Sequence, residues 1–117
     1  MQNLNQLLHE MTIEEKISLL AGHKSWHTNK ISRLNIPAIF LTDGPHGLRK
    51  KKESSKEIGL GSTELSTCFP TAATTASSWN KNLLYQMGLA MGKECNHYDV
   101  NVILGPAINI KRNPLCG

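Results

Sequence analysis

Apolar residues near the N-terminus recur at steps of three and four, the period of a helix with one buried face. The positions are Ile13, Ile17 and Leu20. They predict an amphipathic helix over residues 12–21, and Thr12 and Glu15 have the spacing of a capping box at its start. Gly22 offers a left-handed stop at its end. The leucines within residues 4–8 predict a shorter helical turn before it.

The middle and the end of the chain predict a strand, a long helix and a second strand. Residues 36–41 are continuously apolar, which suits a strand buried on both faces. Further along, apolar side chains recur at helical spacing and predict a helix over residues 81–97, with Asn80 as its cap. Residues 100–104 form the second apolar strand. This order predicts an α/β fold with a parallel sheet, in which the loops after the strands lie together.

The segments between these elements give weaker signals. Residues 50–68 are rich in Lys, Glu, Ser, Thr and Gly, and predict a long mobile loop. Residues 71–78 are small and weakly polar, and we interpret them as a packed segment. Gly88 and Gly92 lie one turn apart in the predicted long helix, so we expect its backbone to pack closely against the sheet there.

The positive charge of the chain is concentrated in one place. The formal net charge is +4, and residues 49–52 are all Arg or Lys. Nucleic-acid-binding proteins usually spread basic charge over a face and interleave aromatic residues, so this local run favours a solvated loop over a phosphate-binding patch. We therefore expect no nucleic-acid partner, and a basic nucleic-acid-binding protein is kept as an alternative.

The sequence also bears on the compartment of the protein and on two other classes of site, a metal site and a serine-hydrolase site. The cysteines form no CxxC pair, which favours a reducing compartment. The N-terminus lacks a secretion signal and no apolar run reaches membrane-spanning length, so we expect a cytoplasmic protein with no membrane partner. His23 and His27 have no third ligand nearby, so no metal site is expected. A serine hydrolase is not supported, because the GxSxG motif is missing.

The segment TDGPHGLRK, residues 42–50, follows the first predicted strand with charged residues and a tight turn. Loops positioned in this way often deliver side chains to a ligand. Asp43 can accept two hydrogen bonds from neighbouring hydroxyls, and Arg49 can donate from the opposite side of the turn. Sugars present such hydroxyl pairs. The alternative is an ion pair between Asp43 and Arg49 that only fixes the loop.

Four segments of the chain together resemble the N-terminal region of glycoside hydrolase family 3, especially its bacterial β-glucosidases. They occur in the same order and with similar spacing as in that family: MTIEEKISLLAG, TDGPHGLRK, TCFPTAATTASSWN and LGPAINIKRNPLCG. The resemblance implies the incomplete N-terminal portion of a (β/α)8 TIM-like barrel, which needs about 250 residues when complete. Residues 1–117 would then be a partial barrel domain, with the rest of the barrel and a second domain absent.

The resemblance also implies which residues bind the sugar. Asp43 would hydrogen-bond the glucose in the innermost subsite, and Arg49 would help to line that subsite. The residues expected to shape the loop are Gly44, Pro45, His46 and Gly47. No catalytic residue is carried over, because the family's nucleophile, in a Ser-Asp-Trp-like motif, and its acid/base have no counterpart in this sequence. A further sugar-binding arginine of the family would follow residue 117.

The implied activity is hydrolysis of terminal non-reducing β-D-glucosyl residues with retention of configuration. This chain would hold part of the sugar subsite and is expected to be inactive alone. The expected partner is a small β-glucoside or oligosaccharide, with no cofactor and no metal. The alternative is a non-catalytic carbohydrate-binding or interaction module that uses the same Asp43 and Arg49. Asn-Lys-Asn at residues 80–82 departs from the family's usual Asp-Pro-Glu, which alters helix capping by about 1 kcal/mol.

Overall fold

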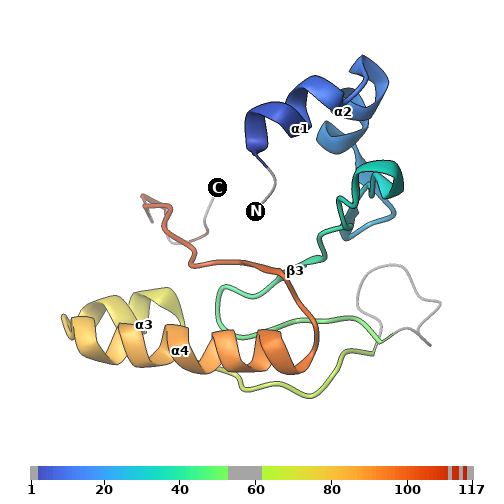
Figure 1. The fold of residues 1–117 in the computed structure, drawn as a ribbon. Coiled ribbons are helices and arrows are strands. Elements are labelled where there is room, and N and C mark those ends of the chain that lie inside the picture. The colour runs from blue at the N-terminus through green and yellow to red at the C-terminus, as the bar shows by residue number, and fades with distance from the viewer. Residues whose placement is uncertain (1–2, 53–61, 111, 114, 116–117) are drawn as a thin grey trace. The chain divides into compact units, whose positions relative to one another are not determined.

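The computed structural model describes residues 3–52, 62–110, 112–113 and 115 (Figure 1). The chain divides into two compact units, and the division falls between Leu41 and Thr42. In the part of the chain that the structure describes, no helix is long and apolar enough to cross a membrane.

The first unit begins with two short helices, α1 (Leu4–Glu10) and α2 (Ile13–Leu20). Both were expected from the sequence. The hydroxyl of Thr12 accepts a hydrogen bond from the Glu15 N–H at 3.2 Å, and the Glu15 carboxylate accepts one from the Thr12 N–H at 2.9 Å. The predicted capping box is therefore confirmed, and it satisfies two backbone donors that the first turn of a helix leaves without partners.

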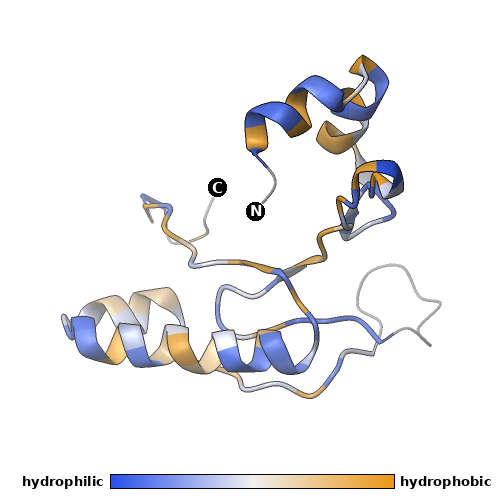
Figure 2. Ribbon diagram, viewed as in Figure 1, coloured by the Kyte–Doolittle hydropathy of each residue, from blue (hydrophilic) through white to orange (hydrophobic). Residues whose placement is uncertain are grey.

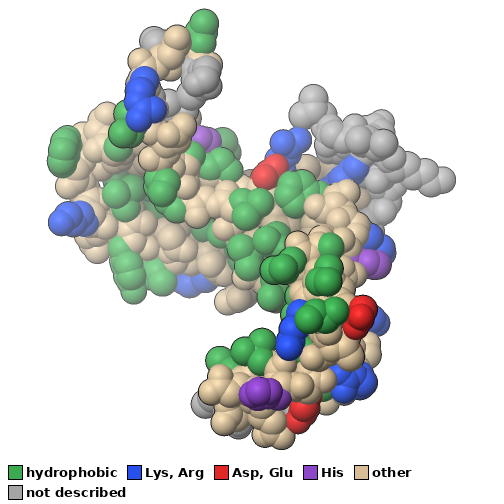
Figure 3. Space-filling view, turned by 90° about the horizontal axis from the view of Figure 1, so that it is seen from above, with side chains coloured by type: hydrophobic (Ala, Val, Ile, Leu, Met, Phe, Trp, Pro, Cys, Tyr) green, Lys and Arg blue, Asp and Glu red, His purple; other side chains and the backbone are tan. Residues whose placement is uncertain are grey.

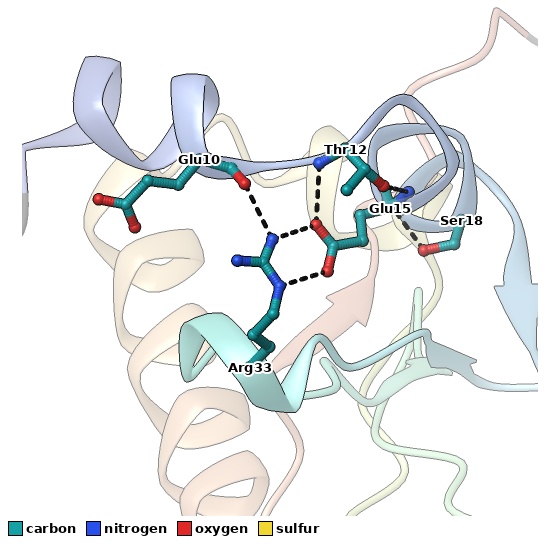
Figure 4. Close-up of polar contacts among 5 residues, drawn as sticks. All are labelled: Glu10, Thr12, Glu15, Ser18 and Arg33. Atoms are coloured by element: carbon teal, nitrogen blue, oxygen red, sulfur yellow. Dashed lines mark hydrogen bonds and ion pairs between the residues drawn. The ribbon is translucent and has the colours of Figure 1, made fainter.

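An arginine ties the start of α2 to the short 3-10 helix η1 (Ser32–Leu34), as Figure 4 shows. Arg33 donates to both carboxylate oxygens of Glu15, at 2.7 and 3.1 Å, and to the backbone oxygen of Glu10 at 2.8 Å. The hydrogen bonds from Arg33 and from the Thr12 N–H hold the pKa of the Glu15 carboxyl below its usual range. The same carboxylate raises the pKa of Arg33.

A small apolar cluster holds the first unit together. Met11, Ile31 and Leu34 are its buried members, and the residues packed against them are Leu7, Leu19 and Ile36. Figure 2 shows hydrophobic and hydrophilic residues side by side along both helices. Part of the apolar face is exposed to solvent: Ile13 is 66% and Leu20 is 90% exposed. Figure 3 shows in green the hydrophobic side chains at the surface of the molecule.

The end of α2 differs from the sequence prediction. Gly22 does not take a left-handed conformation but lies in β1 (Gly22–His23), which pairs antiparallel with β2 (His27–Thr28). The positive φ falls at Lys24, because the hairpin turns there and not at the helix end. His23 and His27 lie opposite each other in this hairpin, and the His27 ring stacks on Phe40 with the centroids 4.6 Å apart.

The strand predicted over residues 36–41 is shorter and lies further along the chain. The observed strand β3 is Leu41–Asp43, while Ile36 and Phe40 form isolated bridges only. Burial alternates in this run: Ile36, Ala38 and Phe40 are half-buried, while Pro37 and Ile39 are exposed. The prediction of burial on both faces was wrong, because the described residues cover one side of the segment.

Strands β3 and β4 (Val102–Leu104) are neighbours in a two-stranded sheet. The connection between them contains the 17-residue helix α4 (Lys81–His97), which is orange in Figure 1. Its predicted bounds and cap are confirmed, since Asn80 accepts a hydrogen bond from the Leu83 N–H at 3.0 Å. The predicted order of strand, helix and strand is also confirmed, with β4 starting two residues later than expected.

A further helix, α3 (Ala72–Ser77), occupies the segment that we interpreted as merely packed. Its hydroxyl groups bond to backbone carbonyls of the preceding turn. Thr75 donates to the Thr71 and Ala72 oxygens at 3.2 and 3.1 Å, and Ser77 donates to the Ala73 oxygen at 2.8 Å. Small polar residues are poor indicators of a helix, and this one shows no apolar stripe that a periodicity analysis could detect.

The glycines of α4 are not closely packed against a sheet, so that prediction was wrong. Among the described residues, nothing outside the helix backbone lies within 4 Å of the position that a Cβ would take at Gly88 or Gly92. Both line an apolar groove of about 370 Å³ together with Thr75 of α3 and Ile103 of β4.

Residues 53–61 of the predicted loop lie outside the described residues. The flanks of that segment pair with each other, which differs from the loop that the sequence predicted for them. Lys51 and Thr63 form an antiparallel bridge, and the Lys52 N–H donates to the Ser62 oxygen at 3.0 Å.

Candidate functional site

The chain reverses direction directly after β3 and brings Asp43 opposite Arg49. The two residues form an antiparallel bridge, in which the Arg49 N–H donates to the Asp43 backbone oxygen at 2.9 Å. Thr42 is buried, and its hydroxyl donates to the Arg49 backbone oxygen at 2.6 Å. Backbone contacts therefore hold the two predicted sugar-binding residues side by side.

The turn between them depends on two glycines. Gly47 has φ of +133°, a conformation that residues with a side chain rarely adopt, and a Cβ at this position would run into the backbone oxygen of Thr67. At Gly44 a Cβ would run into the side chain of Ile103, in β4. The turn also lies close to Gly105, just after β4. The loops that follow the two strands therefore lie together, as expected from the order of elements.

The same loop lines a hollow of about 340 Å³. Its lining residues are Asp43, Gly44, Pro45, His46, Gly47 and Arg49. Asp43 is half-buried and Arg49 is exposed. The hollow thus offers one acceptor-only group and one donor-only group, on a short and tightly held turn.

The alternative, an ion pair between Asp43 and Arg49 that only fixes the loop, does not agree with the structure. Within residues 3–52 and 62–110, no ion pair joins the carboxylate of Asp43 to the guanidinium of Arg49. The loop is fixed by its backbone instead, so both charged ends are available to a ligand.

His46 contributes a polar atom with no partner in the described part of the chain. Its Nδ1 is buried and makes no hydrogen bond there. Buried polar atoms in proteins are nearly always hydrogen-bonded. We therefore expect this face of the loop to meet a further group, either a ligand or another part of the protein.

The described residues also bear on two other kinds of site, a metal site and a cysteine nucleophile. The described residues contain no cluster of three or more His, Cys, Asp or Glu side chains that could hold a metal ion. Cys95 is buried, and this burial, together with the charge of neighbouring Glu94, raises the pKa of its thiol. A protonated thiol is a poor nucleophile.

The basic run is not simply a solvated loop, which corrects the sequence interpretation. The Nζ of Lys50 donates to the backbone oxygen of Tyr98, the cap residue at the end of α4, at 2.7 Å. A cation is favoured at this end of a helix, where carbonyl oxygens lack partners.

The sequence analysis also did not identify a backbone segment that is hydrogen-bonded to the loop. Ser66 donates to the Leu48 backbone oxygen at 2.5 Å, and the Phe69 N–H donates to the His46 backbone oxygen at 2.7 Å. Neither contact has a signal in the sequence, because each joins residues that are distant along the chain.

Residues 7–117 match the sequence model of the Glycosyl hydrolase family 3 N terminal domain. The chain belongs to glycosyl hydrolase family 3. The resemblance seen in the four sequence segments is thereby confirmed.

Family 3 relatives match almost the whole of this chain. It is 45% identical over 115 residues to thermostable beta-glucosidase B of Acetivibrio thermocellus, covering 98% of this chain and 15% of that protein. It is 50% identical over 109 residues to the exo-alpha-(1->6)-L-arabinopyranosidase of Bifidobacterium longum, covering 92% of this chain and 14% of the relative. The chain therefore spans about a seventh of the length of these curated relatives.

A solved beta-glucosidase structure has the same fold over this region. The beta-glucosidase of Kluyveromyces marxianus, solved in complex with glucose, superposes with a TM-score of 0.83 at 42% sequence identity. The superposition covers 96% of this chain and 13% of the yeast enzyme.

Proposed function

We propose that this chain forms part of the glucose-binding subsite of a retaining family 3 β-glucosidase. The observation that carries the proposal is the placement of Asp43 and Arg49 opposite each other, on a rigid turn that lines a hollow. We further propose that the two units form the opening portion of a (β/α)8 barrel in that enzyme. A cytoplasmic location stays a prediction.

The two side chains complement a sugar in different ways. The carboxylate of Asp43 can accept hydrogen bonds from two adjacent hydroxyls of a pyranose ring, and the guanidinium of Arg49 can donate to ring or hydroxyl oxygens. Hydrogen bonds to charged groups are stronger than those between neutral groups. Support also comes from the yeast relative, whose structure was solved in complex with glucose.

Bond cleavage needs groups that this hollow does not supply. A retaining glycosidase places two carboxyl groups about 5–5.5 Å apart across the scissile bond. Asp43 is the one carboxylate among the residues that line the hollow. The proposed role of the chain is therefore to hold and orient the sugar, while the nucleophile and the acid/base come from outside the described residues.

The test uses the full-length hydrolase that carries this segment, with an aryl β-glucoside as substrate. Asp43→Asn removes the charge, so we expect kcat/KM to fall about 10- to 150-fold, since a hydrogen bond to a charged group contributes about 1.5–3 kcal/mol. Asp99→Asn is the matched control, because Asp99 is exposed and its positive φ suits Asn equally well. An Asp43→Asn enzyme with the kcat/KM of the wild type would refute the assignment.

The activity named for one relative suggests a second substrate to test. The Bifidobacterium longum protein, 50% identical over 109 residues, is an arabinopyranosidase. An aryl α-L-arabinopyranoside should therefore be assayed beside the glucoside. If neither is cleaved, but glucose binds and Asp43→Ala abolishes that binding, the non-catalytic carbohydrate-binding alternative is the better account.

A further inference from the structure

We call residues 43–49 the sugar loop. Its position depends on a neighbouring backbone segment to which it is hydrogen-bonded. We call residues 65–69 the support segment. Its Ser66 and Phe69 bond to the backbone oxygens of Leu48 and His46, at 2.5 and 2.7 Å. The space at Gly47 is filled by the Thr67 backbone oxygen. A shift of the support segment therefore moves the turn between Asp43 and Arg49.

The support segment has no secondary structure of its own to fix it. Side chains from the end of α4 do so instead. The carboxylate of Glu94 accepts a hydrogen bond from the Thr67 N–H at 3.1 Å and another from the Thr67 hydroxyl at 2.5 Å. The Tyr98 hydroxyl donates to the Leu65 backbone oxygen at 2.6 Å.

The helix that provides these side chains is a suitable anchor. Helix α4 is 17 residues long and is capped by Asn80. Its C-terminal end also receives Lys50, which directly follows Arg49 in the chain. The last turn of α4 is thus tied both to the loop and to the segment behind the loop.

We propose that Glu94 is a positioning residue for the sugar subsite, acting through Thr67 on the loop that carries Asp43 and Arg49. The proposal rests on the sugar-binding function proposed above. Glu94 does not line the hollow, so its effect is indirect. Misplacement of a binding group by about 1 Å can reduce activity up to about 100-fold, so a distant support residue can have a large effect.

The two hydrogen bonds make a prediction about conservative replacement. Both Thr67 donors make their shorter hydrogen bond to the same oxygen, Oε1 of Glu94, and the Thr67 N–H also makes a longer one of 3.4 Å to Oε2. A glutamine keeps such an oxygen and can accept both bonds, whereas an alanine removes them. Glu94→Gln should therefore retain the position of the loop better than Glu94→Ala.

The experiment compares Glu94→Ala, Glu94→Gln and Lys93→Ala in the full-length hydrolase. Lys93 is the neighbouring exposed residue on the same helix and serves as the matched control. For Glu94→Ala we expect kcat/KM to fall about 10- to 100-fold, mainly through a raised KM. Hydrogen exchange of the amides in residues 43–49 should also become faster. Lys93→Ala should match the wild type in both measurements, and Glu94→Gln, which keeps one acceptor oxygen without the charge, should lie between Glu94→Ala and the wild type.

Hydrogen exchange separates failure of this proposal from failure of the proposed function. If the wild type cleaves no β-glucoside, the proposed function fails, and exchange in residues 43–49 still tests Glu94. If Glu94→Ala does not fold, Thr67→Val removes the hydroxyl donor alone and should still accelerate exchange. Unchanged exchange and unchanged KM in a folded Glu94→Ala enzyme would overturn the proposal.

Discussion

A methyl group added at Gly47 should damage sugar binding more than it damages the fold. The φ of +133° at this position suits glycine, and a Cβ would overlap the backbone oxygen of Thr67. A backbone atom cannot rotate away as the end of a flexible side chain could. Gly47→Ala therefore forces either the turn or the support segment to move.

The size of the effect follows from the strain. A residue held in a backbone region of this kind costs about 1–3 kcal/mol. If the turn moves to relieve that strain, the loss of transition-state binding is of the same size, which corresponds to about 5- to 150-fold in kcat/KM. Global stability should change less, because the displacement is confined to a loop and to the segment behind it.

The assay measures kcat/KM for an aryl glucoside and the Tm of the full-length hydrolase. Gly22→Ala is the control, because a Cβ there would meet its nearest atoms, the backbone oxygens of Lys24 and His27, at ordinary distances of 3.7 and 3.8 Å. We expect this control to match the wild type. If Gly47→Ala has wild-type kcat/KM and wild-type Tm, the argument from the turn geometry is wrong.

Two further predictions concern the helices. The pKa of Glu15 lies below its ordinary value of 4.5, so its stabilising effect is present above about pH 4.5 and is lost as the pH falls through the folded-state pKa. Glu15→Gln should lower the Tm at pH 7, and the difference should vanish in acid; a difference that persists at low pH would contradict this. In a peptide of residues 80–98, replacing Gly88 and Gly92 by Ala should raise helicity measured by circular dichroism, since each change favours the helix by about 1 kcal/mol. Equal helicity would show that these glycines do not limit the helix.

Elements with local signals were predicted well from the sequence. The bounds of α4 and its Asn80 cap, and the capping box of Thr12 and Glu15, depend on residues within a few positions of each other. Such interactions are present in any chain with that spacing, because the helix itself brings the groups together. Neither required knowledge of the rest of the fold.

The errors concern features that depend on distant partners. An apolar run does not show how many of its residues pair with another strand. Strand β3 covers only Leu41–Asp43, and its partner β4 is equally short. Gly22 looked like a helix stop, but the hairpin formed by β1 and β2 takes that residue into a strand. The helix α3 has no apolar period, so no pattern could identify it.

The same difference between local and distant contacts applies to the candidate site. That Asp43 and Arg49 lie side by side was predictable from one short motif, since a tight turn between them is enough to make them neighbours. Their role in sugar binding stays a prediction. Glu94 was not identified, because 27 positions separate it from Thr67. In the sequence it was one acidic residue in a predicted helix, and the usual expectation for such a residue is a solvated face.

Gly47 and Glu94 both lie next to Thr67. The Thr67 backbone oxygen fills the space beside Gly47, while the Thr67 N–H and hydroxyl bond to Glu94. A glycine is needed at position 47 because the support segment comes so close, and the support segment stays close because a helix holds it. The geometry of the sugar loop is therefore set by contacts outside the hollow. If Asp43 and Arg49 bind the sugar as we propose, residues that never touch the sugar determine how well they bind it.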